Sequence, residues 1–310
     1  MRQASGHNQM RAFATLAFGA VCISFAAIFV KMLGAGRMGP GSIAFWRMIL
    51  GTGILFVWAV LAGHSVRLPW AIKRWSILAG FLFFCDLFSW HRSILLSGAG
   101  MATILASTQV FGTAILSYYI FRERLSAAFF VAAASGLVGV ALLIGVGSDI
   151  AFTGGYLKGV FLGLLTGVFY AHYIVVIKIS GQREGTPASF ITLMAWTSLF
   201  CAIFLGVASG LTEANEFWPP DLYSWGVLFA LGLIPQAIGW WAISKSLPRV
   251  DAHKSGLALL LQPVLATVWG WIFFTERLTL LQTVGAVVTL GAIYLGTIGR
   301  QGRVAAPEAD

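Results

Sequence analysis

Four polar side chains lie near the centres of long apolar runs, where a membrane-spanning residue is farthest from water. They are Asp86 in the run 76–97, Gln109 in 99–121, Gln236 in 222–247 and Gln262 in 251–274. A charged residue at the centre of a membrane-spanning helix costs roughly 2.5–3.5 kcal/mol on insertion scales, so Asp86 needs a partner, water or a proton. Together the four residues predict a polar site halfway through the membrane. Each glutamine could instead tie two helices together through a hydrogen bond worth roughly 0.6–2 kcal/mol.

Asp86 shares a helical face with small polar and aromatic residues. At spacings of three and four, this face carries Asp86, Ser89, Trp90, Ser93 and Ser97. Such a face suits a cavity that admits water and substrate, and we expect Asp86, Trp90 and Ser93 to line it. The serines could instead bond to backbone carbonyls or pack as small residues.

Aromatic side chains are predicted at the same depth. Trp90 is joined there by Tyr170, Tyr173, Trp240 and Trp241. Their faces could bind an apolar group, or an ammonium through cation–π attraction, and their hydroxyl and indole groups supply polar handles. We expect Trp90, Tyr170, Tyr173 and Trp240 to line the cavity, with lipid contact or packing as the alternative for each.

Two arginines lie inside spans, near the ends that we expect to face outward. Arg47 and Arg92 could attract a substrate carboxylate near the outward mouth, or Arg92 could compensate the charge of Asp86. Against the second idea, Arg92 is rotated by about 120° from Asp86 on an ideal helix. The alternative for both, and for Lys31 at the end of its helix, is that the long side chain reaches the membrane interface.

Two histidines and two prolines complete the set of candidate residues. His91 and His172 titrate near neutrality and could couple transport to protons, although a histidine within a membrane is often a hydrogen-bonded structural residue. Pro235 and Pro263 adjoin Gln236 and Gln262, and each removes an intrahelical hydrogen bond. They predict a hinge or a site, with a static kink as the alternative.

The elements that position these residues are long apolar helices. Of 310 residues, 58% are hydrophobic and only 10% are charged, and the mean hydropathy is +0.86. Soluble domains have about 45–50% apolar and about 25% charged residues, so a soluble fold is excluded. Apolar runs between turn residues predict ten spans, at 12–32, 42–62, 76–97, 99–121, 125–145, 155–178, 187–209, 222–247, 251–274 and 279–299.

Charge distribution sets the orientation. If the N-terminus is cytoplasmic, fourteen Lys and Arg residues fall on the inner segments and four on the outer ones. Positively charged residues concentrate on the cytoplasmic side of membrane proteins. We therefore expect both termini inside.

An internal repeat divides the chain into residues 1–148 and 149–310. The segment Phe121–Ser126 matches Phe274–Thr279 at an offset of 153 residues. Further matches place Lys31 on Lys178, Asp86 on Gln236, Trp90 on Trp240 and Gln109 on Gln262. Each half holds five spans, an odd number, so the second half must enter the membrane from the opposite side. Secondary transporters are often built from such inverted repeats, with the substrate site where the repeats meet.

On these residues the chain resembles the drug/metabolite transporter superfamily, in particular its ten-helix EamA-type members and the amino-acid exporters of the YddG type. The likeness covers residues 12–299 and rests on two helices that end in Lys31 and Lys178, and on Glu-Arg-Leu-Ser and Glu-Arg-Leu-Thr after the fourth span of each half. It implies a helical bundle around a central cavity, and alternating access that moves small metabolites outward.

We therefore expect a secondary transporter of the bacterial inner membrane that exports small polar metabolites, with amino acids as the first candidate. A cationic drug or nucleotide derivative is the alternative substrate, and a membrane enzyme is a more distant alternative. Cys22, Cys85 and Cys201 lie in apolar stretches without metal-ligand spacing, and no ATP-binding loop is present. We expect no metal, cofactor or nucleic-acid partner, and the oligomeric state stays open, with a monomer possible.

Overall fold

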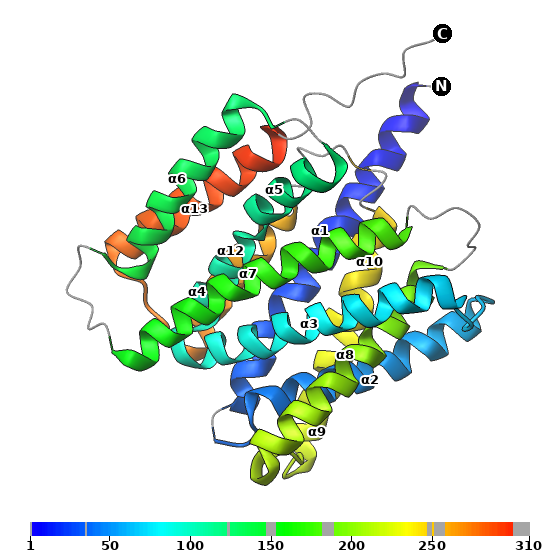
Figure 1. Cartoon of the computed structure of the whole chain (residues 1–310). Coiled ribbons are helices and arrows are strands. Elements are labelled where there is room, and N and C mark those ends of the chain that lie inside the picture. The colour runs from blue at the N-terminus through cyan, green and yellow to red at the C-terminus, as the bar shows by residue number, and fades with distance from the viewer. Residues whose placement is uncertain are drawn as a thin grey trace.

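The computed structural model describes residues 2–34, 36–122, 125–146, 153–181, 189–246, 250 and 258–299. Within these ranges every regular element is a helix (Figure 1), which confirms the predicted all-α class. The elements are α1 (Arg2–Gly34), α2 (Pro40–Leu61), α3 (Trp70–Ser97), α4 (Ala99–Ser107), α5 (Gln109–Phe121), α6 (Ala127–Ile144), α7 (Gly154–Gly181), α8 (Phe190–Thr212), η1 (Ala214–Glu216), α9 (Leu222–Leu231), the π-helical segment η2 (Gly232–Gly239), α10 (Trp240–Ser246), α12 (Leu261–Phe274) and α13 (Leu280–Gly299).

The helices have the length and composition of a multi-pass membrane protein. In the described part of the chain, seven stretches are long and apolar enough to cross a membrane, and two shorter apolar helices follow at Leu261–Phe274 and Leu280–Gly296. α3 is also 28 residues long, but it carries Asp86 and several basic residues. It begins at Trp70 rather than at residue 76, because the helix continues past the apolar run to Pro69, whose carbonyl accepts the amide hydrogens of Ile72 and Lys73.

Two of the spans are interrupted. α4 ends and α5 begins around Thr108, whose hydroxyl donates to the carbonyl of Leu105 at 2.6 Å. Between α9 and α10 the chain widens into η2, which contains Pro235. Proline has no amide hydrogen to donate, and wide π-helical turns are frequent at functional sites.

Pro263 does not lie where the sequence predicts. The chain turns at Leu260, and Pro263 occupies the first turn of α12 rather than the middle of a helix. The amide groups of a first helical turn have no acceptor within the helix, so proline is tolerated there.

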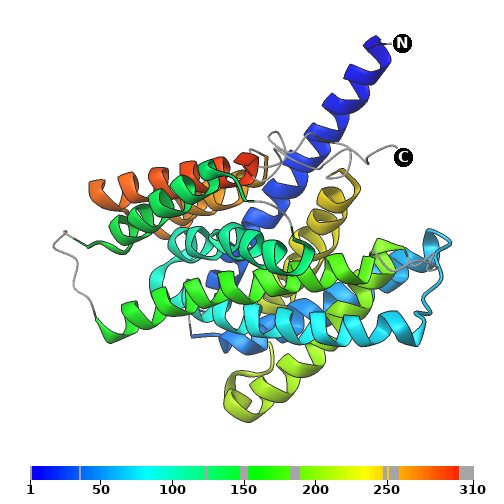
Figure 2. The same cartoon turned by 45° about the horizontal axis from the view of Figure 1, so that its top comes forward.

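Helices distant in sequence pack in pairs. α3 lies along α7, α2 along α8, and α6 along α13 (Figures 1 and 2). α1 packs against α9, η2, α10 and α12, while α4 and α5 pack against α7. The strip Gly159, Gly163 and Gly167 on α7 makes these approaches possible, because a Cβ on any of the three would come within 3.0 Å of α3, α4 or the turn at Thr108.

Two tryptophans anchor α2 and α8 in the same way, 150 residues apart in sequence. The indole nitrogen of Trp46 donates to the carbonyl of Phe217 at 2.9 Å, and that of Trp196 donates to the carbonyl of Val66 at 2.8 Å. Each acceptor lies in the connection that follows the partner helix.

The connections after α5 and α12 also share their geometry. Arg122 has φ 55° and Thr275 has φ 53°, and they are the non-glycine residues with positive φ in the described chain. Each connection leads to a helix whose first turn is capped by a hydroxyl, Ser126 before α6 and Thr279 before α13.

Two lysines at matching helix ends also contact matching rings. The Lys31 ammonium lies 4.8 Å from the ring centroid of Phe274, and the Lys178 ammonium lies 4.1 Å from that of Phe121. Both contacts are within the range of cation–π attraction.

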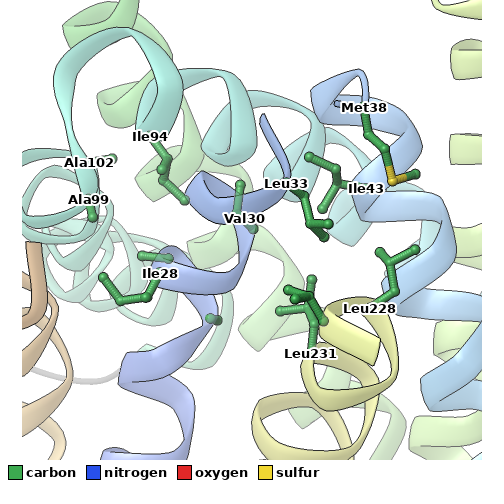
Figure 3. Close-up of a cluster of buried hydrophobic side chains, with 13 residues drawn as sticks. Ile28, Val30, Leu33, Met38, Ile43, Ile94, Ala99, Ala102, Leu228 and Leu231 are labelled. Atoms are coloured by element: carbon green, nitrogen blue, oxygen red, sulfur yellow. The ribbon is translucent and has the colours of Figure 1, made fainter. Parts of the chain in front are cut away.

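One end of the bundle is closed by an apolar cluster. We call this end the Lys31 face: α1, α3, α8 and α12 end there, and α2, α4 and α9 begin there. Leu33 of α1 lies beside Ile43 of α2 and faces Leu228 and Leu231 of α9, whereas Ile28 of α1 extends toward Ala99 of α4 (Figure 3). These side chains are at most 2% exposed, so the Lys31 face is tightly packed.

Candidate functional site

Seven of the residues singled out in the sequence form one connected cluster, called here the central cluster. It consists of Arg47 from α2, Asp86 and Trp90 from α3, Tyr170 and Tyr173 from α7, Gln236 from η2 and Trp240 from α10. Its members join α2 and α3 to helices from the second part of the chain. The cluster is therefore built only when the helix pairs of the fold assemble.

Gln236 holds Arg47 in place. The Arg47 Nε donates to the Gln236 Oε1 at 3.2 Å, and the Gln236 amide nitrogen donates to the hydroxyl of Ser198 at 3.3 Å. Gln236 has no exposed surface. Gly51 makes room for it, because a Cβ at Gly51 would come within 2.5 Å of the Gln236 Cγ. The three helices α2, α8 and η2 thus fix one glutamine in one orientation.

Aromatic rings form a wall beside the two charged groups. Tyr170 stacks on Tyr173 at 5.8 Å and meets Trp240 edge-on at 6.2 Å. Tyr173 in turn stacks on Phe83 at 4.8 Å. Trp90 presents its ring to the Arg47 guanidinium, 5.8 Å from the centroid. Rings in this arrangement offer both apolar faces and polar edges to a small molecule.

The two charges of the cluster are buried without touching. Arg47 is 3% exposed and Asp86 is 5% exposed. They interact electrostatically, yet the three ion pairs within 4.0 Å among the described residues involve neither of them. The Arg47 Nη1 is buried and has no hydrogen-bond partner. A buried charge in protein is normally paired, so this arrangement makes Arg47 and Asp86 candidates for a functional site.

For three predicted cavity residues the structure shows other hydrogen bonds or positions. The Ser93 hydroxyl donates to the Gly159 carbonyl at 2.7 Å, in the contact between α3 and α7. Gln109, at the start of α5, accepts a hydrogen bond from Thr113 of its own helix at 2.8 Å. Gln262 is half-buried in the first turn of α12. Among the described residues, no hydrogen bond or ring contact joins Ser93, Gln109 or Gln262 to the central cluster.

The two histidines have different surroundings. His91 is fully buried, contacts the ring of Trp90 and shares a hydrogen bond of 3.1 Å with the Pro40 carbonyl. His172 is exposed on α7, where its Nδ1 lies 2.8 Å from the carbonyl of Val168 on the same helix. Only His91 therefore adjoins the central cluster.

Arg92 pairs with a glutamate that the sequence did not single out. Its guanidinium forms an ion pair with Glu213 and lies over the ring of Phe88. Glu213 also accepts the backbone amide of Ser42, at 2.9 Å, and so caps the first turn of α2. The sequence offers no signal for this pairing, because the two residues are 121 positions apart, with Arg92 in a span and Glu213 in the connection after α8.

Two further ion pairs cross the Lys31 face. Lys31 of α1 pairs with Glu276, whose carboxylate also accepts the backbone amide of Ala99 at the start of α4. Arg37 pairs with Asp221, which caps α9. A cavity of about 340 Å³ adjoins Glu276, but it lies away from the central cluster. The repeated Glu-Arg-Leu motif was the sequence signal for Glu276.

Among the described residues, no group of three or more His, Cys, Asp or Glu side chains is placed to hold a metal ion.

A model of the EamA-like transporter family matches residues 10–145 and again residues 157–298. The chain belongs to the EamA-like transporter family. The resemblance seen in the sequence is thus confirmed, and this EamA-like protein is a multi-pass membrane transporter rather than an enzyme.

Named relatives of this EamA-like transporter include exporters. It is 28% identical over 173 residues to the threonine/homoserine exporter RhtA of Escherichia coli (strain K12). The aligned region covers 55% of this chain and 53% of RhtA, so the match spans about half the length of that protein. It is 25% identical over 209 residues to a probable amino-acid metabolite efflux pump of Salmonella typhimurium, covering 65% and 68% of the two chains. A crystal structure of a protein with 20% identity superposes with a TM-score of 0.66 over 94% of this chain and 97% of the other, which shows the shared fold.

Proposed function

We propose that this EamA-like transporter exports small polar metabolites, amino acids first among them, by exposing the central cluster alternately to the two sides of the bacterial inner membrane. The observation that carries the proposal is the cluster itself. An acid, an arginine, an amide and an aromatic wall lie together, buried inside the helical bundle. Polar and ionisable residues within a membrane mark substrate or ion pathways.

The architecture proposed for this mechanism is ten membrane helices in two inverted halves, residues 1–148 and 149–310. Four observations support it. The family model matches the chain twice. Trp46 and Trp196 make equivalent hydrogen bonds. Arg122 and Thr275 share a left-handed conformation. Lys31 and Lys178 contact matching rings at opposite ends of the bundle.

The structure has the features of a state closed at the Lys31 face. Three ion pairs cross that face, and each joins a residue of 1–148 to a residue of 149–310. Beneath them lies the apolar cluster of Figure 3, again with side chains from both halves. Alternating access then requires these ion pairs to separate, because they connect the two bodies that move apart.

The Lys31 face is proposed to lie on the periplasmic side, with both termini in the cytoplasm. The support is the excess of Lys and Arg on the opposite segments, fourteen against four. Export is then movement from the termini side to the Lys31 face.

The names of the relatives favour amino acids as substrates. RhtA is named for threonine and homoserine, and the Salmonella protein for amino-acid metabolites. The alternative substrate within this fold is a cationic drug or a nucleotide derivative. The aromatic wall and Asp86 would also suit an organic cation, and that keeps the alternative open to experiment.

Counterflow in proteoliposomes tests the substrate. Vesicles preloaded with unlabelled threonine, homoserine, an aromatic amino acid, an organic cation or a nucleotide sugar receive the labelled compound outside. We expect at least one amino acid to exchange faster than in protein-free vesicles, and Asp86→Asn to slow that exchange by about tenfold or more, the loss of one charge-assisted contact. Exchange of the cation or nucleotide sugar alone would overturn the proposed substrate.

Cross-linking tests alternating access. Lys31→Cys and Glu276→Cys are combined in a chain whose native Cys22, Cys85 and Cys201 are replaced by alanine. We expect a thiol-reactive cross-linker to stop transport in the double variant and not in either single variant. A cleavable cross-linker should restore transport on reduction. Unchanged transport by fully cross-linked protein would contradict the mechanism.

A further inference from the structure

We infer that the central cluster recognises a zwitterion at two points, with Arg47 binding the carboxylate and Asp86 binding the ammonium of one molecule. The inference rests on the proposed function and makes it more specific: substrates must carry both groups on one carbon atom, and Arg47 is the residue that separates amino acids from organic cations.

The guanidinium of Arg47 is held in a position to receive a carboxylate. A guanidinium has five N–H donors in a planar fork and stays charged. Its Nε is occupied by Gln236 at 3.2 Å. No described residue accepts a hydrogen bond from the two terminal nitrogens, and Nη1 is both buried and unpartnered. Terminal nitrogens of this kind bind a carboxylate through two parallel hydrogen bonds.

A structural ion pair does not explain Arg47. Two other arginines of the described chain, Arg37 and Arg92, each contact a carboxylate directly. Arg47 is buried more deeply than either, at 3% exposure, yet it lacks such a contact. Leaving a buried charge without its partner is strongly destabilising. Arg47 therefore has the geometry of a group whose partner is the transported molecule.

Asp86 supplies the complementary charge. No described residue donates a hydrogen bond to its carboxylate, and it interacts electrostatically with Arg47 and with Tyr170. The two groups have opposite signs, are both buried and do not touch within 4.0 Å. An α-amino acid carries its ammonium and carboxylate on one carbon, so it can bridge such a pair. A cation without a carboxylate would leave Arg47 unpaired and add like charge beside it.

The aromatic wall is left for the rest of the molecule. Trp90 shields the Arg47 guanidinium, Tyr170 interacts electrostatically with Asp86, and Trp240 packs edge-on against Tyr170. Residues that bind the invariant part of an amino acid are thus separate from residues that face its side chain.

Competition by analogues tests the inference. Once an exchanged amino acid is known, unlabelled competitors are its amide, which lacks the carboxylate, and its N-acetyl derivative, which lacks the ammonium. In the wild type we expect each analogue to compete about tenfold or more weakly than the amino acid, since each loses a charge-assisted hydrogen bond. Arg47→Gln should abolish discrimination against the amide only, and Asp86→Asn should abolish discrimination against the N-acetyl derivative only.

Gly53→Ala serves as the matched control. Gly53 lies on α2, the helix that carries Arg47, and a Cβ at Gly53 would meet nothing within 4 Å. It should retain both discriminations. If Arg47→Gln does not fold, two experiments replace that variant. One is the same competition assay with Arg47→Lys, and the other measures how much each analogue raises the thermal unfolding midpoint of the wild type. Equal competition by amino acid and amide in the wild type would overturn this inference while the proposed export stands. Exchange of no amino acid at all would overturn the proposed function itself.

Discussion

Arg122 and Thr275, 153 residues apart, adopt nearly the same left-handed backbone conformation, at φ 55°, ψ 29° and φ 53°, ψ 27°. Each is the residue at which a helix ends before a short connection. Side chains strain this conformation by about 1–2 kcal/mol, and glycine does not. The same strained conformation therefore occurs twice, at the ends of α5 and α12.

Thr275→Gly should therefore stabilise the protein. We expect a gain of roughly 1 kcal/mol, reduced somewhat by the greater freedom of glycine in the unfolded chain. Thermal unfolding in detergent would show it as a higher midpoint. Thr275→Ala, which keeps a Cβ, is the control and should bring no comparable gain. A glycine variant less stable than the alanine variant would contradict the role of backbone strain.

Gly285→Ala should loosen the contact between α6 and α13. A Cβ at Gly285 would lie 2.3 Å from the backbone nitrogen of Leu143, which cannot move away as a side chain could. Overpacking of this kind typically costs about 1–3 kcal/mol, so we expect a clear fall in the unfolding midpoint. Gly291→Ala on the same helix meets nothing within 4 Å and should be neutral or slightly stabilising. Equal midpoints for the two variants would show that α6 and α13 are farther apart than described.

Arg92 and Glu213 should be energetically coupled. Their side chains are 18% and 9% exposed, so solvent screens the pair only in part. Removing one partner leaves a charge with fewer partners in a poorly solvated place, and we expect Arg92→Gln and Glu213→Gln each to destabilise by roughly 1–3 kcal/mol. In a double-mutant cycle the double variant should lose less than the sum of the single variants. Strict additivity would mean that the two charges do not interact.

Gly51→Ala should disturb the central cluster without removing any polar group. Its Cβ would press on the Gln236 side chain, which holds Arg47. We expect slower transport with little change in the unfolding midpoint, because Gln236 is a side chain that can move aside. Gly53→Ala, two positions along α2 in open space, is the control. Wild-type transport by Gly51→Ala would show that the position of Gln236 is not critical.

Much of the architecture could be predicted, because apolar runs bounded by turn residues define membrane helices. The sequence does not encode how the helices cross. Asp86 and Ser93 lie on one face of α3 by spacing, yet of the two only Asp86 interacts with Arg47, electrostatically and without direct contact. Ser93, farther along that face, meets Gly159 where α7 crosses close by. Spacing along one helix cannot tell which neighbour covers each level of its face.

Arg47 and Glu213 show the same limit for long side chains. Position in the sequence placed Arg47 near a membrane interface, but its guanidinium reaches Gln236 in the interior. Glu213 follows α8 in a polar connection, yet its carboxylate reaches back to Arg92 and to the start of α2. Such reach depends on tertiary packing, whereas the depth of a backbone position follows from the apolar run that contains it.

The carboxylate of Glu276 serves α1 and α4 at once, through Lys31 and through the backbone amide of Ala99. Neither partner can be released alone without leaving the shared carboxylate poorly satisfied. Movement at this end of the molecule is therefore expected to be concerted: the two helices should part from Glu276 in one step, and partly opened forms should be too sparse to detect in the resting ensemble.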